Sequence, residues 1–518
     1  MNSPDVKSGA GKWMALTAAL LGWMFDGAEM GLFSLVGRSA IRDLLGMTAE
    51  SQTDAQKQQV AFLFSVIIAM FLVGAATGGV LFGWLGDRIG RVRAMSLSVV
   101  TYAVFTGLCG FATSAWQIAI LRFIAALGMG GEWSLGVALV MEVWPNRSRA
   151  LMAGLIGAAA NVGYLLVGFL GLVLAKVPET IKAWLLALGI PANEVTRLVS
   201  NDAWRLLMIM GVAPALLTFF FRLFVPESEK WEKEQKSGGT SNWASRDLLG
   251  VLIGALGPTL IVYVFANKFS WGVRLGCSIV GVIIATVGYL YPVMQYLKRV
   301  NLAAGSASTQ NRTAVRRMML AACLSGVALM GTWGASQQTP SWAASLVDPK
   351  LSGQAASWTL IFLSLGAITG TLLGALIGGW LGRRITYCLL CLASLGSVWM
   401  WASNCHMYGN EFLGYAFLSG TFTASFYGWL PLYLPELFGT NVRATGQGFG
   451  FNFGRILAAV GALQATALRD LFTTDLKLAG LTFPKGYPAL LATVCMIYLV
   501  GAVIIWFAPE TKGQPLPD

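Results

Sequence analysis

The stretch "GGVLFGWLGDRIGR" at residues 78–91 carries a long apolar run into a short charged turn. A second stretch, "LIGGWLGRR" at residues 376–384, repeats its glycines, tryptophan and arginines in the other half of the chain. Two further pairs follow in the same order: "EVWPNRSRALMAG" from Glu142 with "ELFGTNVRATGQG" from Glu436, and "VPESEKW" (225–231) with "APETKG" (508–513). Similar segments in a constant order indicate an internal repeat. The sequence therefore predicts two homologous halves.

The composition is that of a membrane protein. Of 518 residues, 56% are hydrophobic and only 12% are charged, whereas soluble domains carry about 25% charged residues. Apolar runs of about 18 residues or more can cross a bilayer as helices, and such runs recur along the whole chain. We expect an all-α polytopic membrane protein with about fourteen transmembrane helices, at 13–37, 59–82, 94–112, 116–143, 150–175, 204–225, 248–266, 274–297, 317–346, 355–380, 385–403, 408–435, 444–468 and 488–508.

The repeat also predicts the domain boundaries. We expect residues 1–230 to form an N-terminal six-helix bundle and residues 316–518 to form a C-terminal six-helix bundle. Residues 231–315 have no counterpart in the repeat. They are expected to form a central insertion with two extra transmembrane helices and a basic linker.

Positive charge predicts the orientation in the membrane. The net charge of the chain is +12. The basic residues gather at the ends of the expected spans, in the loops 86–93, 145–149 and 382–384 and between Lys298 and Arg317. Under the positive-inside rule these loops are cytoplasmic, and an even number of spans leaves both termini in the cytoplasm. Membrane topology therefore explains the excess of basic residues, and binding to nucleic acid is not needed to account for it. We expect a multi-pass protein of the cell (inner) membrane.

The sequence shows none of the patterns of enzymes or pumps. It has no phosphate loop, nucleophile triad or metal-ligand cluster, and its soluble segments are too short for a nucleotide-binding domain. Cys388 and Cys391 form a CxxC inside a span with no second pair, which favours helix packing over a metal or redox site. His406, the only histidine, lies in a short loop between spans. We expect no enzymatic activity, no cofactor and no metal.

Five charged residues lie at membrane depth. Asp26 and Glu29 share one face of the first span because they are three residues apart, Arg122 and Glu132 lie in the fourth span, and Arg455 lies in the eleventh. A charge at the bilayer centre costs about 2.5–3.5 kcal/mol on insertion scales, so these residues must face a cavity or one another. Internal pairing, for example of Arg122 with Asp26 or Glu29, is the structural alternative to a functional role.

Several of these stretches resemble the major facilitator superfamily: "GWLGDRIGRVRAM", "RFIAALGMGGEW", "EVWPNRSRALMAG", "PESEKW", "LPELFGTNVRATGQG" and "PETKG". Within it, "MFDGAE", "GMGGEW", "ATGQGFGFNFGR" and the two extra central helices resemble the sialate:proton symporter group, which includes bacterial sialic acid permeases and yeast lactate permeases. The stretch "WGASQQ" (333–338) lacks the histidine and acid of the lactate permeases, which weakens a lactate assignment. The resemblance implies two six-helix bundles and a functional monomer.

The residue types suggest roles for the charges at membrane depth. A carboxylate in a low-dielectric cavity holds a proton more readily than one in water, so we expect Asp26 and Glu132, with Glu29 as a third, to couple protons. Arginine grips a carboxylate bidentately and stays charged, which makes Arg455 the first candidate for a substrate anion and Arg122 the second. Neutral groups expected to complete the binding site are Asn161, Tyr164, Gln337, Gln338, Tyr427 and Asn452.

Charged residues at the cytoplasmic helix ends form a candidate gate, because paired charges can latch two halves and separate when the halves rock. We expect Glu142 with Arg149, and Glu436 with Arg443, to cap neighbouring helix ends. The full candidate set is Asp87, Arg88, Arg91, Glu142, Arg149, Glu436 and Arg443. The alternative is topology plus solvated helix caps.

Together these features predict a proton-coupled symporter that works by alternating access. The expected substrate is a small organic anion, with an acidic sugar such as sialic acid favoured over a monocarboxylate such as lactate or pyruvate. An aromatic acid, a passive facilitator and a non-transporting nutrient receptor are the alternatives. The expected partners are the organic anion, protons and the lipid bilayer, with no nucleic acid.

Overall fold

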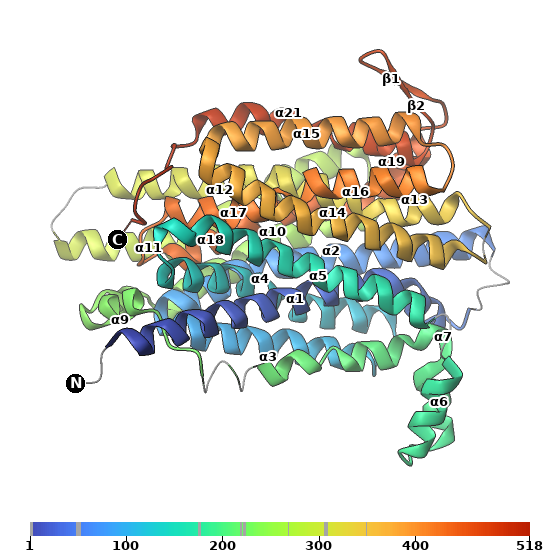
Figure 1. The fold of residues 1–518 in the computed structure, drawn as a ribbon, viewed down its shortest axis with the longest axis horizontal. Helices are drawn as coiled ribbons and strands as arrows, with labels where there is room; N and C mark the ends of the chain where they lie inside the picture. Colours follow the sequence, from blue (N-terminus) through green and yellow to red (C-terminus); the bar gives the residue numbers. More distant parts are fainter. Residues whose placement is uncertain are drawn as a thin grey trace.

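A computed structural model describes residues 4–47, 53–174, 178–217, 220, 224–267, 269–304, 309–348 and 350–517. Long helices run side by side along one axis, and loops gather at the two ends of the bundle (Figure 1). The loops 86–93, 145–149 and 382–384 lie at one end, which we call the basic end. The start of α1 (Pro4–Leu44) and residues 509–517 lie at this same end.

The first half is built from long, apolar helices. Its elements are α1, α2 (Asp54–Ile89), α3 (Arg91–Cys109), α4 (Ala115–Val143), η1 (Asn146–Ser148), α5 (Arg149–Leu174), α6 (Pro178–Ala187), α7 (Ala192–Met210) and η2 (Ala213–Leu216). A central segment follows, with α9 (Glu229–Lys236), η3 (Gly239–Asn242), η4 (Ser245–Asp247), α10 (Leu248–Ala266) and α11 (Trp271–Ala304).

The second half repeats this pattern with more interruptions. Its elements are α12 (Thr309–Gly334), η5 (Ser336–Gln338), α13 (Thr339–Ser345), α14 (Ser352–Leu381), α15 (Arg383–Asn404), α16 (Asn410–Ala424), α17 (Phe426–Tyr433), η6 (Leu434–Leu437), α18 (Arg443–Asn452), α19 (Gly454–Leu471), α20 (Tyr487–Val494), α21 (Ile497–Ile504) and η7 (Ile505–Phe507). The strands β1 (Leu476–Leu478) and β2 (Leu481–Phe483) pair antiparallel in a hairpin at the end opposite the basic end (Figure 1).

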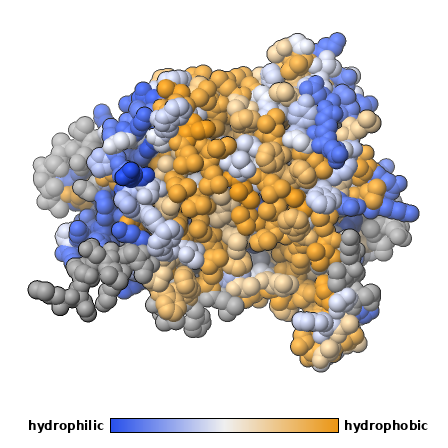
Figure 2. Space-filling view, in the orientation of Figure 1, coloured by the Kyte–Doolittle hydropathy of each residue, from blue (hydrophilic) through white to orange (hydrophobic). Residues whose placement is uncertain are grey.

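The expected helical membrane fold is confirmed apart from the short hairpin, with a difference in how its spans are divided. Eleven helices of the described residues are long and apolar enough to cross a bilayer. The expected spans 408–435 and 444–468 each form two shorter helices, interrupted at Ser425 and Phe453, where the backbone keeps helical dihedral angles. The expected span 204–225 lies partly outside the described residues. Figure 2 shows the resulting belt of apolar surface between two polar ends.

The two halves meet along two seams related by the repeat. On one seam α2 packs against α18 and α19, and on the other α14, the counterpart of α2, packs against α5. The helices α10 and α11 pack together, and α10 also contacts both α2 and α19. The hydroxyl groups of Thr77 in α2 and Tyr289 in α11 are 2.8 Å apart. The central pair therefore covers the α2 seam.

Glycines with positive φ make the equivalent sharp turn in each half. Gly90 (φ 112°) joins α2 to α3, and Gly382 (φ 101°) joins α14 to α15. The next residue is an arginine in both cases, Arg91 and Arg383, and its backbone N–H donates to a carboxylate, that of Glu227 at 2.9 Å in the first half. In the second half this carboxylate belongs to Glu510.

We predict that Gly90→Ala destabilises the fold by about 1–3 kcal/mol, because a non-glycine residue is strained at this φ and its Cβ would collide with the Glu227 carboxylate. Gly396→Ala in α15 is the matched control, since nothing lies within 4 Å of the added Cβ, and it should stabilise by up to about 1 kcal/mol. Thermal unfolding of both variants in detergent measures the difference. Equal unfolding temperatures would contradict the strain argument.

Candidate functional site

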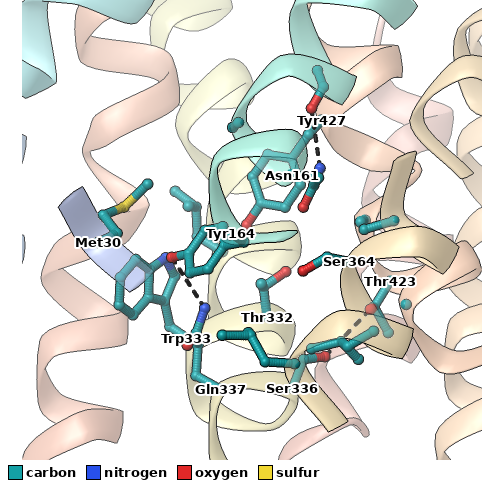
Figure 3. Close-up of a pocket in the computed structure, with 18 of the residues that line it drawn as sticks. Met30, Asn161, Tyr164, Thr332, Trp333, Ser336, Gln337, Ser364, Thr423 and Tyr427 are labelled. Carbon is teal, nitrogen blue, oxygen red and sulfur yellow. Dashed lines mark hydrogen bonds between the residues drawn. The ribbon is translucent and has the colours of Figure 1, made fainter. Parts of the chain in front are cut away.

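A cavity of about 720 Å³ lies between the two halves. Its lining residues come from α1 and α5 in the first half and from α12, η5, α14, α16, α17, α18 and α19 in the second. Figure 3 shows polar side chains of both halves converging on it. A second cavity of about 960 Å³ lies toward the end opposite the basic end and shares Trp333, Gln337 and Leu360 with the first.

Arg455 is the only charged residue among the described residues that line the central cavity. Its side chain is 2% exposed, and its Nε and Nη1 atoms have no hydrogen-bond partner in the described part of the chain. The guanidinium lies over the Phe451 ring at 5.5 Å, and Tyr164, Tyr427 and Asp26 are its other interaction partners. An unpaired buried cation at a cavity wall is suited to bind an anion.

Asp26 and Glu132 are two buried carboxyl groups near Arg455 that also lack hydrogen-bond partners in the described structure. Both are fully buried, and none of their four carboxylate oxygens has a hydrogen-bond partner among the described residues. The two carboxyl groups interact with each other, and Asp26 also interacts with Arg455. Asp26 is placed by α1, one turn from the cavity-lining Trp23 and Met30. Glu132 fits against Gly22, where any larger residue would clash with its carboxylate.

Glu29 and Arg122 pair with each other instead of facing the cavity. The Arg122 Nη1 atom is 2.5 Å from the Glu29 Oε1 atom, and Thr106 also donates to that oxygen at 3.3 Å. The guanidinium is sandwiched near the rings of Phe33 and Phe71, at 4.1 and 4.7 Å. The structure thus brings about the internal pairing considered as the alternative, and Arg122 is not a lining residue of the central cavity.

Most of the expected neutral site residues reach the central cavity. Asn161, Tyr164, Gln337 and Tyr427 line it, and the Gln337 amide donates to the Tyr164 hydroxyl at 3.3 Å (Figure 3). Gln338 lines the second cavity instead.

Asn452 lies outside the cavity lining, at the seam between the halves. It is fully buried in α18, and its amide donates to the Gly130 carbonyl of α4 across the seam at 2.9 Å. Its position therefore suits closure of the seam and not direct contact with a bound molecule.

Beyond Tyr164 and Tyr427, sequence reasoning missed the aromatic rings and the hydroxyl groups of the site. Phe451 of α18 stacks on Trp133 of α4 with ring centroids 3.7 Å apart, and Trp23 packs against both rings. Missed lining residues include Trp23, Thr332, Trp333, Ser336, Ser364, Thr423 and Phe451. Helical spacing offered a signal for two of them, because Trp23 and Phe451 lie about one turn from Asp26 and Arg455.

At the basic end, buried charges join the halves along the α2 seam. Arg443 Nη1 of the second half is 2.8 Å from Glu142 Oε1 of the first, and Arg91 bonds the same oxygen at 3.2 Å. Asp87 accepts from Arg91 and from the Thr445 N–H and hydroxyl at 2.9 and 2.6 Å. We call these five residues the latch.

The expected gate pairs are wrong in their partners. Glu436 binds Arg383 of its own half, at 2.6 Å, and not Arg443. Arg149 donates to the Met141 carbonyl and to Asn146 instead of Glu142. The physical reason is that α18 packs on α2 and α4, which carries Arg443 across the seam to Glu142. Arg88 lies off the seam, where it donates to Ser245 of the central segment.

The carboxylates that cap the two glycine turns differ in environment. Burial raises the pKa of Glu227, although N–H donors of Ser228, Val92 and Arg91 oppose the shift. Burial also acts on Glu510, but it is weaker there, and the N–H groups of Arg383, Arg384 and Lys512 hold the pKa of Glu510 below its ordinary value. Glu510 therefore binds the backbone N–H groups of the turn between α14 and α15 as a carboxylate anion.

The comparisons with known proteins agree with this geometry. The model of the "Sugar (and other) transporter" family matches residues 14–246. A solved structure of the proton:xylose symporter XylE superposes with a TM-score of 0.63 at 16% identity, covering 98% of both chains. This chain has the major facilitator fold.

Relatives along the full chain are also transporters. A probable 4-methylmuconolactone transporter of Cupriavidus pinatubonensis is 26% identical over 96% of this chain and 90% of its own length. A cis,cis-muconate transport protein of Acinetobacter baylyi is 22% identical over 89% of this chain and 88% of its own. The chain thus has the fold and the apolar spans of a multi-pass membrane protein of the major facilitator type, and these relatives are transporters, not enzymes.

The similarity to a sialic acid permease covers less of the chain than the similarity to the two relatives above. The sialic acid transporter NanX of Escherichia coli is 27% identical, but only over 43% of this chain and 45% of its own length. The sialate grouping therefore stays a prediction, and the broader transporter class is what the comparisons support.

We predict that Glu29→Gln destabilises the protein by about 3–5 kcal/mol, because it leaves the buried Arg122 charge unpaired. The double variant Glu29→Gln/Arg122→Met should recover most of this loss, since it removes both charges and keeps apolar volume. Thermal unfolding in detergent, with Arg122→Met as the second single variant, gives the coupling energy. A stable Glu29→Gln protein that has lost proton dependence would instead make Glu29 a proton carrier.

We predict that Arg443→Gln opens the basic end, because it removes the ion pair between the halves. Arg88→Gln is the control at the same end, since Arg88 lies off the seam and donates to Ser245 of the central segment. Spin labels on the exposed Arg93 and on Gln514 report the distance between the halves. Broadening toward longer distances only in Arg443→Gln fits the latch, and equal broadening in both variants contradicts it.

Proposed function

We propose that this transporter is a proton-coupled symporter of a small organic carboxylate. The observation that carries the proposal is the unpaired Arg455 at the cavity wall, beside two buried carboxyl groups that lack hydrogen-bond partners. A transported carboxylate supplies the missing partner of Arg455, and protons supply the missing partners of Asp26 and Glu132.

In this proposal, the position of Asp26 couples the binding of the proton to the binding of the substrate. When Asp26 is ionised, it attracts Arg455 and competes with a substrate carboxylate for the guanidinium. When Asp26 is protonated, Arg455 is left for the substrate. Each ligand thus favours the state that binds the other, which is the reciprocity that coupled binding requires.

The cavity supports a flat or cyclic carboxylate. Trp23, Tyr164, Trp333, Tyr427 and Phe451 give it aromatic walls, and a single arginine faces the space. Unsaturated acids of the kind named for two full-length relatives match that lining. The hydroxyl groups on the second-half side are suited to hydrogen-bond a polyol, which keeps an acidic sugar as the second candidate.

The proposed cycle places the basic end in the cytoplasm of a cell, in the inner membrane. In this cycle the latch closes that end, while the second cavity adjoins the central one on the opposite side. In this cycle residues 1–230 and 316–518 rock about the central cavity, and residues 231–315 follow the α2 seam. A single chain supplies every residue of the cavity, so we propose a monomer as the functional unit.

Uptake by proteoliposomes tests the proposal. We expect labelled cis,cis-muconate, sialic acid or lactate to enter with wild-type protein in response to an inward proton gradient. Arg455→Gln should lower the affinity about 10- to 100-fold, because a charge-assisted hydrogen bond contributes about 1.5–3 kcal/mol. Asp26→Asn should abolish accumulation but retain exchange between internal and external substrate.

Asp54→Asn is the charge-matched control, because Asp54 is exposed and pairs only with Lys57. It should transport as the wild type does. If neither the proton gradient nor Asp26→Asn changes the uptake, the protein is a passive facilitator. Binding without uptake in folded protein would favour a nutrient receptor.

A further inference from the structure

The repeat fixes which residue of the second half stands where Asp87 stands in the first. In each half the arginine after the turn glycine donates to the carbonyl five residues earlier, Arg91 to Gly86 at 2.8 Å and Arg383 to Gly378 at 2.7 Å. With the turns aligned in this way, Gly379 is the counterpart of Asp87. The shared letters "GWLG" of the two stretches are therefore offset by about one helical turn in space.

This replacement removes an anion from the second seam. On the first seam the Asp87 carboxylate accepts from the N–H groups of Ala444 and Thr445, at 3.2 and 2.9 Å, and joins the halves. The counterpart of Ala444 in the repeat is Ala150, and an added Cβ on Gly379 would lie 3.0 Å from the Ala150 Cβ. The second seam therefore brings Gly379 close to Ala150 but has no carboxylate there.

A cavity takes the place of the missing carboxylate. It is open to solvent, has a volume of about 1190 Å³ and is lined from the first half by Asn146, Arg147 and Ala150. From the second half its lining residues are Leu376, Gly379, Trp380, Arg383, Leu432, Lys512 and Gly513. Three of the lining side chains are basic, and none of the described lining residues is acidic.

The nearest carboxylates are already engaged. Glu436 accepts from Arg383 and from Thr511. Glu510 accepts from the backbone N–H groups of Arg383, Arg384 and Lys512. Arg147 is exposed, and no acidic group of the described residues lies within ion-pair distance of it. Arg383 is therefore compensated by Glu436, whereas the positive charges of Arg147 and Lys512 lack a counter-ion among the described residues.

The surroundings of this cavity indicate where its counter-ion comes from. Trp380 is 74% exposed and Leu376 is 46% exposed, on the same helix and beside the basic side chains. Tryptophan is enriched where the acyl chains meet the headgroups of a bilayer. Basic pockets between transmembrane helices at the cytoplasmic surface suit acidic lipid headgroups.

We propose that an anionic phospholipid places its phosphate in the cavity lined by Arg147, Arg383 and Lys512. The lipid phosphate then joins the two halves at the basic end of the second seam, as the Asp87 carboxylate joins them on the first. Bound lipid stabilises the closed basic end, so the composition of the membrane sets how readily this seam opens. The inference is independent of the transported substrate.

Thermal unfolding of purified protein tests this site without any transport assay. Phosphatidylglycerol added to protein in phosphatidylcholine micelles should raise the unfolding temperature by about 2 °C or more, as expected for a ligand of the folded state. The double variant Arg147→Gln/Lys512→Gln should lose this rise. Arg312→Gln/Arg316→Gln, which removes two exposed basic residues of the same end outside the cavity, should keep it.

Gly379→Asp provides a second, positive test, because it restores the carboxylate. This variant should unfold at a higher temperature than wild type in phosphatidylcholine alone and gain little from phosphatidylglycerol. An equal rise in all variants would overturn the proposal, since the lipid effect would then be non-specific. An equal rise of the wild type with inorganic phosphate would overturn the lipid source and leave a site for free phosphate.

Discussion

Charge compensation in a low-dielectric interior governs this structure, because an unpaired ion inside a membrane protein is expensive to keep. The protein answers this constraint in two ways. Arg122 is neutralised by Glu29 and packed between two rings, which makes it part of the fold. Arg455 has no acidic partner within ion-pair distance in the described structure and faces a cavity, which makes it available to a ligand. The contrast between the two arginines separates structure from function more clearly than their depth in the membrane does.

The same constraint makes the two seams unequal. On the α2 seam, Asp87, Glu142 and Arg443 form a buried network that spans the halves. On the α14 seam the counterpart of Asp87 is Gly379, and the seam is hollow at the basic end. A buried network with complete partners is rigid, whereas a hollow seam depends on what enters it. The repeat therefore provides one seam closed by the protein itself and one seam open to its surroundings.

The sequence predicted the repeat, the helical class and the depth of the charges, because these depend on periodicity and composition along one chain. The sequence did not predict which charged residues pair with one another. Glu142 lies seven residues from Arg149, which suggests a local pair, but its partner is Arg443 on a helix of the other half. Pairing across a seam depends on the packing of α18 against α2 and α4, and no local pattern contains that information. The stacking of Trp133 on Phe451 escaped prediction for the same reason.

One stretch of the second half connects the latch with the binding cavity. Arg443 begins α18, Asn452 ends it, and Arg455 follows in the first turn of α19. At 1.5 Å per residue, the twelve residues from Arg443 to Arg455 span about 18 Å. Asn452, three residues before Arg455, holds the cavity end of this stretch to α4 through the Gly130 carbonyl. In the proposed cycle, a carboxylate that draws Arg455 toward the cavity therefore acts on the same helical stretch that Glu142 holds at the basic end. The interruption at Phe453 sets the limit of that coupling, because a bend there would let Arg455 move without Arg443.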